Sequence, residues 1–180
     1  MNLSKFRFGA RGQFFSPDLL VAIGIFLFSL AFFWAGSNFI FEETSLFNSR
    51  IESDEIAHAI LNKLVLSSGE PINWESKELV DVNSFGLVHS NNFLDFNKTI
   101  TLINSLNSSE DYDLVRYKIG AGKYDLELSV VDSKNEVISN PIPLVGGRVV
   151  IEPILKATHT RIVYYDGEEV LLRIILSIEE

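Results

Sequence analysis

Residues 19–41 carry no charged side chain, and this stretch constrains the fold more than any other feature of the chain. It reads LLVAIGIFLFSLAFFWAGSNFIF. As an α-helix it would be about 34 Å long, whereas the hydrocarbon core of a bilayer is about 30 Å thick. A water-soluble helix that is apolar all round needs partners on every side, which the remaining 139 residues could hardly supply. The sequence therefore predicts a transmembrane helix over residues 19–41.

Charge is distributed unequally around this stretch. Lys5, Arg7 and Arg11 precede it with Asp18 as the one acidic residue, whereas residues 42–180 contain 12 Lys/Arg and 23 Asp/Glu, a formal charge of −11. Because short basic segments stay in the cytoplasm, we expect the N-terminus inside the cell and the acidic part outside. The acidic excess argues against nucleic acid as a partner. The chain has no cysteine, which excludes disulfides and thiolate metal sites.

Residues 1–18 form a basic leader that ends in a helix start. Ser16 can cap free backbone N–H groups, Pro17 suits the first helical position, and Asp18 favours the positive end of the helix dipole. A signal anchor with a basic flank explains these residues without any processing. Cleavage by a signal peptidase at Ala35-Gly36-Ser37 is another alternative, although the apolar run is about twice as long as a usual signal-peptide core.

Arg11-Gly12-Gln13, followed by FFSPDLL, resembles the N-terminus of archaeal type IV pilin-like proteins with a class III signal peptide. The resemblance implies a prepilin-type peptidase as a partner, with cleavage between Gly12 and Gln13. It also implies that Asp18 pairs with the free N-terminal amine of a neighbouring subunit and sets the register of assembly. In that family the acidic residue usually stands fifth in the mature helix, whereas here Asp18 stands sixth. Cleavage after Gln13 would restore the spacing but lose the preferred glycine.

Beyond residue 41 the helix is expected to continue as an amphipathic helix over residues 42–68. Apolar side chains recur at helical spacing from Leu46 to Val65, with charged side chains between them. Gly69 suits a left-handed cap and Pro71 cannot continue the helix. A core helix of any tethered domain would show the same pattern.

Two short strings extend the resemblance into the domain that follows. Residues 69–74, GEPINW, and residues 84–87, SFGL, are similar to strings in the ectodomains of archaeal pilin-like proteins. In physical terms they predict a turn, an aromatic plug and a short strand, with Trp74 in the core.

The rest of the chain changes from helical to strand periodicity. Short helices are predicted over residues 97–106 and 111–117, and a half-buried strand over 124–130 with residues 136–138 pairing back on it. Asn140–Pro143 and Gly146-Gly147 are interpreted as a loop, and residues 148–155 as a strand broken at Pro153. Asp166-Gly167 predicts a hairpin turn between strands 161–165 and 168–178. The fold class is α+β, with a long N-terminal helix packed on a mainly antiparallel head over residues 69–180, as in pilins.

Candidate sites are few. His58, His89 and His159 have no second histidine or cysteine at ligand spacing, and no catalytic, cofactor or metal motif is evident. Asn97-Lys98-Thr99 and Asn107-Ser108-Ser109 are N-glycosylation sequons in the part expected outside the cell.

These patterns favour a structural function over an enzymatic one. The leading hypothesis is a pilin-like, single-pass surface protein that acts as a subunit or accessory part of a type IV pilus-like filament or of the cell envelope. Its helices would pack against membrane lipid or other pilin-like subunits, and small residues would allow close approach: Ala22, Gly24, Ala31, Ala35 and Gly36. The alternatives are a non-assembling, membrane-anchored extracellular binding module and an extracellular enzyme, which would need a concave cluster of polar side chains.

Overall fold

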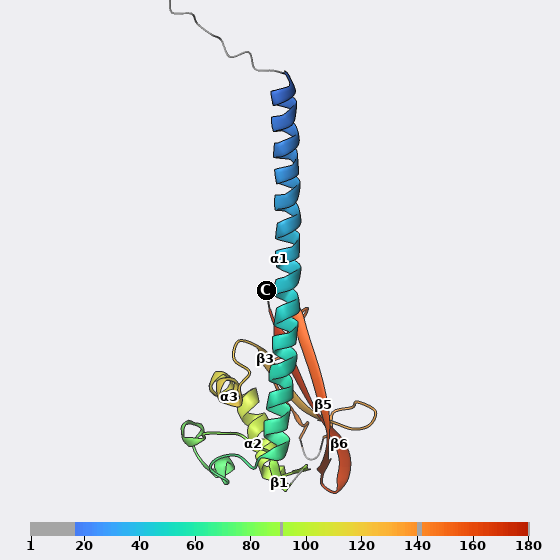
Figure 1. Cartoon of the computed structure of the whole chain (residues 1–180). Coiled ribbons are helices and arrows are strands. Elements are labelled where there is room, and N and C mark those ends of the chain that lie inside the picture. The colour runs from blue at the N-terminus through green and yellow to red at the C-terminus, as the bar shows by residue number, and fades with distance from the viewer. Residues whose placement is uncertain (1–16, 91, 140–141, 180) are drawn as a thin grey trace, which may run out of the picture. The chain divides into compact units, whose positions relative to one another are not determined.

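The computed structural model describes residues 17–90, 92–139 and 142–179, and it leaves the side chains of residues 38–46 undescribed. The chain divides into two compact units, one ending at Ser45 and one beginning at Leu46. Figure 1 shows the elements in chain order: α1 (Pro17–Leu66), 3₁₀-helices η1 (Trp74–Ser76) and η2 (Leu79–Asp81), β1 (Val88–Ser90), β2 (Phe93–Leu94), α2 (Phe96–Asn107), α3 (Tyr112–Ile119), β3 (Asp125–Val131), β4 (Val145–Gly147), β5 (Leu155–Tyr165) and β6 (Glu168–Ile178).

The second unit contains a six-stranded sheet in the order β1-β2-β5-β6-β3-β4. Four neighbouring pairs are antiparallel, and β2 pairs with β5 in parallel through Phe93 and Tyr164. The α+β class and the mainly antiparallel sheet are therefore confirmed. The Asp166-Gly167 turn is confirmed as well, because both residues have positive φ angles, 51° and 85°, which a two-residue turn of the primed type requires.

The core of this unit lies between the sheet and the helices. Alternation along the strands turns one side chain in two toward the helices, so that Leu128 and Ile174 are fully buried in the core, while Ser129 and Arg173 meet on the other face of the sheet. Figure 1 shows the C-terminal part of α1 alongside the strands, near α2 and α3. The α1 side chains buried in this core are Ala57, Ile60, Leu61, Leu64 and Val65. The amphipathic pattern therefore packs as expected at this end, whereas Phe47 and Ile51 are exposed.

The strings GEPINW and SFGL form one packed corner. Trp74 is buried, donates from Nε1 to the carbonyl of Gly86 at 2.9 Å, and meets Phe85 edge to face at 5.0 Å. A Cβ on Gly86 would lie 2.2 Å from the carbonyl oxygen of Ser67, so the corner can close only around glycine. The prediction that Trp74 belongs to the core is confirmed. Gly69 does have a positive φ of 87°, but α1 ends at Leu66, so Gly69 shapes the turn rather than the helix cap.

Two expectations for residues 140–155 are wrong. Gly146-Gly147 belongs to β4, which pairs with β3, because the missing side chain at Gly146 lets α2 lie close: an added Cβ would be 2.7 Å from the carbonyl oxygen of Ile103. Residues 148–154 form a loop instead of a strand, and β5 begins only at Leu155. Glu152 has a φ of 62°, which turns the chain within the segment that was predicted to be extended.

The predicted short helices agree with the structure within two residues, whereas β5 begins six residues before the predicted strand 161–165 and the SFGL string contributes only an isolated bridge at Ser84. Helices α2 and α3 extend the predicted ranges slightly, with Asp95 capping the backbone N–H of Lys98 and Gly120 ending α3 at a φ of 106°. The turn after β3 folds back so that Val137 bridges Val131.

Candidate functional site

Helix α1 supplies the first candidate functional surface. Among the described residues, its segment Pro17–Ser37 is long and apolar enough to cross a membrane, and none of it is buried within the chain. The hydroxyl of Ser29, in the middle of the segment, is satisfied locally, because Ser29 Oγ donates to the carbonyl of Ile25 at 2.8 Å. An apolar helix with every backbone bond made internally is suited to an apolar environment.

In the Pro17–Ser37 segment, small side chains gather on one face of the helix and bulky side chains lie beside it. At about 100° per residue, Gly24, Ala31 and Ala35 share one face of the helix, while Ala22 lies on the opposite face. A Cβ on Gly24 would have nothing within 4 Å, so this face is open in the isolated chain. Bulky side chains stand beside it, around a hollow of about 370 Å³ lined by Phe28, Ser29, Phe32 and Phe33. Gly36 falls away from the small face, so three of the five expected small residues come together.

The predicted processing residues Gly12 and Gln13 and the predicted cap Ser16 lie outside the described residues. Asp18 is placed in the first turn of α1, where it is exposed. A carboxylate at this position interacts favourably with the positive end of the helix dipole and is accessible to a cationic partner.

The two sequons occupy different environments in α2. Asn97 is an exposed residue of the first helical turn, but the Thr99 hydroxyl of the same sequon is buried and donates to the carbonyl of Asp95 at 2.7 Å. Lys98 between them is also buried, and its ammonium donates to the carbonyls of Ser68 and Ile72 at 2.6 Å each. The sequon is therefore held in helical form with its hydroxyl already engaged.

Asn107 holds the edge strand of the sheet. Its Nδ2 donates to the carbonyl of Val145 at 3.0 Å, and its Oδ1 accepts from the backbone N–H of Gly147 at 3.2 Å. These are the two ends of β4, so the carboxamide at the end of α2 acts as a bracket for that strand. A glycan on Nδ2 would compete with the first of these bonds.

The structure brings together two histidines that are far apart in sequence. The rings of His58 on α1 and His159 on β5 lie 6.4 Å apart, edge to face, and His159 Nε2 lies 3.1 Å from Asp54 Oδ1. Across the described ranges, no group of three or more His, Cys, Asp or Glu side chains is arranged to hold a metal ion. His89 is exposed on β1, away from this pair. The pairing could not be expected from sequence spacing, because it depends on β5 running beside α1.

A polar cluster around Tyr112 was also not expected. The Tyr112 hydroxyl donates to Asp125 Oδ1 at 3.0 Å and accepts from the N–H of Leu126 at 2.9 Å. The guanidinium groups of Arg116 and Arg148 lie 5.7 and 4.6 Å from the centre of its ring. Burial, the largest influence, raises the pKa of Tyr112 to about 12. The hydroxyl thus stays protonated and links α3 to β3.

Comparisons with protein-family descriptions, with curated proteins and with solved structures each gave no match.

Proposed function

We propose that the protein is a single-pass membrane protein of the pilin-like kind, a structural subunit or accessory component of a type IV pilus-like filament or of the cell envelope. The observation that carries the proposal is the Pro17–Ser37 segment of α1, which is apolar and wholly unburied within its own chain. Such a surface needs lipid or other helices around it. The acidic head, with its own α+β core, folds outside the membrane and performs no catalysis.

The proposed mechanism is lateral packing of helices. In the bilayer, lipid covers the segment. In a filament, neighbouring copies replace the lipid, and burial of apolar surface away from water contributes roughly 25 cal/mol per Å². Gly24, Ala31 and Ala35 on one face allow backbones to approach closely, while the phenylalanines beside them fill the remaining space.

Processing and register follow from the resemblance in the leader. A prepilin-type peptidase would cut after Gly12, and the exposed Asp18 carboxylate would pair with the new amine of a neighbouring subunit. Because Asp18 stands one place later than usual, the cut after Gln13 is the second candidate.

A non-assembling, membrane-anchored binding module is the second candidate function. The observation that favours it is an aromatic surface on the outer side of the sheet, where Phe93 and Tyr164 stack at 4.9 Å and remain 50% and 38% exposed. Exposed aromatic pairs offer rigid contact area to a partner.

The mature N-terminus separates the two functions. Mass spectrometry of the protein from its native membrane should give Gln13 or Phe14 as the first residue if a prepilin-type peptidase acts. An intact Met1, or a start beyond Phe33, would refute the pilin-like processing. For topology, a protease added to intact cells should trim the head, and full protection would contradict the external assignment.

A further inference from the structure

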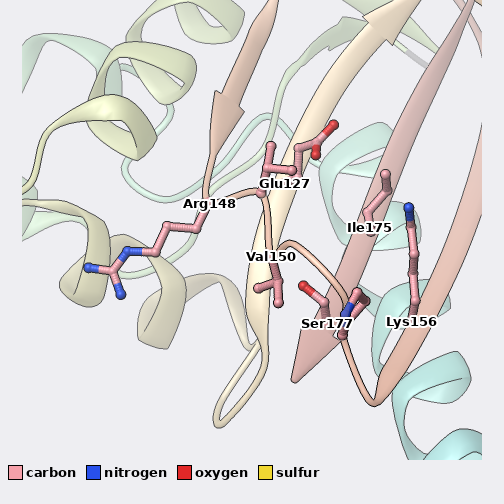
Figure 2. A pocket seen from close by; sticks show the side chains of 8 residues that line it. Glu127, Arg148, Val150, Lys156, Ile175 and Ser177 are labelled. Atoms are coloured by element: carbon pink, nitrogen blue, oxygen red, sulfur yellow. The ribbon is translucent and has the colours of Figure 1, made fainter. Parts of the chain in front are cut away.

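The loop between β4 and β5 presents aliphatic side chains to solvent. Val149, Ile151 and Ile154 are 69%, 85% and 50% exposed. Their neighbours Val150 and Pro153 are only partly exposed and line a hollow of about 20 Å³ against the outer face of the sheet. Figure 2 shows Val150 close to Ser177, with Ile175 nearby and Arg148 extending away from them. The hollow holds at most one water molecule, so the loop rests closely on the sheet while every second or third side chain points outward.

The tip of this loop has an unusual backbone conformation. Glu152 has a φ of 62°, a left-handed conformation that residues with a side chain other than Asn and Asp seldom adopt. Val150 and Pro153, which rest on the sheet, flank this turn on both sides. The turn keeps Ile151 at the most exposed point of the loop.

Two contacts between α1 and β5 place the loop within the head. His159 lies beside Asp54, and Arg161 bonds to Asn62, so β5 runs in the same direction as α1. At about 3.3 Å per strand residue and 1.5 Å per helical residue, Leu155 is about level with Phe47. The loop that precedes Leu155 thus lies at the end where the chain enters the head.

Helix α1 adds to the apolar surface at the same end. Phe47 and Ile51 are 61% and 44% exposed, and they lie on the flank of α1 that faces β5. We call the set Phe47, Ile51, Val149, Ile151 and Ile154 the entry-end surface; its α1 part and its loop part lie at the same end of the head, on opposite sides of the sheet. Arg148 and Lys156 border its loop part, with Glu152 between them.

Chain length limits how far this surface can be from a bilayer that holds the apolar segment. The segment ends at Ser37 and the head begins at Leu46. The intervening residues, about eight, reach at most about 29 Å even when fully extended. A bilayer around residues 17–37 therefore lies no more than about 29 Å from Leu46.

We propose that the entry-end surface docks on the lipid surface of the bilayer that holds this chain's own apolar segment. The inference rests on the proposed single-pass anchoring. The aliphatic side chains enter the boundary between headgroups and acyl chains, while Lys156 remains at the level of the lipid phosphates. The tether keeps the local concentration of lipid surface high, so a few aliphatic side chains suffice for docking.

The absence of cysteine permits a direct test in the full chain. Three single-cysteine variants are labelled with an environment-sensitive fluorophore: Ile151→Cys at the loop tip, Ser29→Cys in the apolar segment, and Val80→Cys as the control. Val80 is 73% exposed, and its carbonyl accepts from the ammonium of Lys118. The carbonyl of Lys118 in turn accepts from Lys63, which stands about 24 Å further along α1 than Phe47. Val80 is therefore far from the entry end. Each variant is reconstituted into phosphatidylcholine–phosphatidylglycerol vesicles with and without a spin-labelled acyl-chain quencher.

The proposal expects the lipid quencher to remove most of the fluorescence at positions 29 and 151 and to leave that at position 80 unchanged. Quenching at 29 with an aqueous signal at 151 overturns the docking while the anchoring stands. A blue-shifted signal at 151 without lipid quenching also overturns it and assigns the surface to a contact with a second copy of the chain. No quenching at 29 refutes the anchoring itself, whatever position 151 does.

Discussion

Substitution of the small face of the apolar helix tests the proposed assembly mechanism. In the double variant Ala31→Leu/Ala35→Leu, two isobutyl side chains replace methyl groups on the face that also carries Gly24. Within the chain this face is open, since Ala31 and Ala35 are exposed and an added Cβ at Gly24 would meet nothing within 4 Å. The variant should therefore insert and fold normally and fail only when helices have to pack closely.

The expected loss in the free energy of association between subunits comes from overpacking of the helix contact. Enlarging a side chain in a closely packed contact costs about 1–3 kcal/mol, so two substitutions weaken each subunit contact by about 2–6 kcal/mol. At about 1.4 kcal/mol per factor of ten, the association constant falls at least about 30-fold.

The assay compares the fraction of protein in filaments sheared from cells with the fraction left in the membrane. Ala22→Leu is the matched control, because it makes the same chemical change on the opposite face. Incorporation should fall for the double variant and be preserved for Ala22→Leu. Equal incorporation of both would refute the assignment of the packing face.

Three further predictions concern the head and are read by denaturant unfolding of the full chain. Asn107→Ala removes two hydrogen bonds to β4 and should lower the free energy of unfolding by about 1–2 kcal/mol. Asn97→Ala on the same helix should change it little, and equal effects of the two substitutions would contradict the role of Asn107 in holding β4. Gly86→Ala places a Cβ 2.2 Å from the carbonyl oxygen of Ser67 and should destabilise the head strongly. Gly24→Ala, where an added Cβ has nothing within 4 Å, should not destabilise it. A Gly86→Ala protein of unchanged stability would contradict the close packing around Trp74 and Gly86. Burial raises the pKa of Tyr112 from 10 to about 12, so its contribution to the free energy of unfolding is complete below pH 10 and is lost as the pH rises toward 12. If Tyr112→Phe shows the same loss of stability between pH 10 and 12, the Tyr112 hydroxyl does not cause that loss.

The parts of the fold that local chemistry determines were predictable from sequence. The Asp166-Gly167 turn and the alternation on either side of it gave the β5–β6 hairpin, although β5 begins six residues before the predicted start at 161. An apolar N-terminal helix was predictable because the uncharged run over residues 19–41 has few structural solutions, and the segment long and apolar enough to span a membrane is Pro17–Ser37.

The predictions that were wrong, and the contacts that were missed, concern features that depend on tertiary packing. Gly146-Gly147 has a composition typical of a loop, and it forms a strand because α2 lies against it. Residues 148–154 have the composition of a strand, but the left-handed Glu152 turns them into a loop with an apolar outer side. His58 and His159 are 101 positions apart in sequence, and Asn107 is about 40 positions from the ends of β4. No local sequence pattern indicates contacts over such separations.

The proposed function in its strongest form is that of a processed, pilin-like subunit of a surface filament, and fractionation of the native cell tests this form. Filaments are sheared from intact cells, and the protein in the sheared and membrane fractions is analysed by mass spectrometry for its first residue. For a filament subunit, the sheared fraction should contain the complete head, with a mature chain that begins at Gln13 or Phe14. A protein found only in the membrane fraction, with Met1 intact, would contradict the claim and leave a tethered binding module.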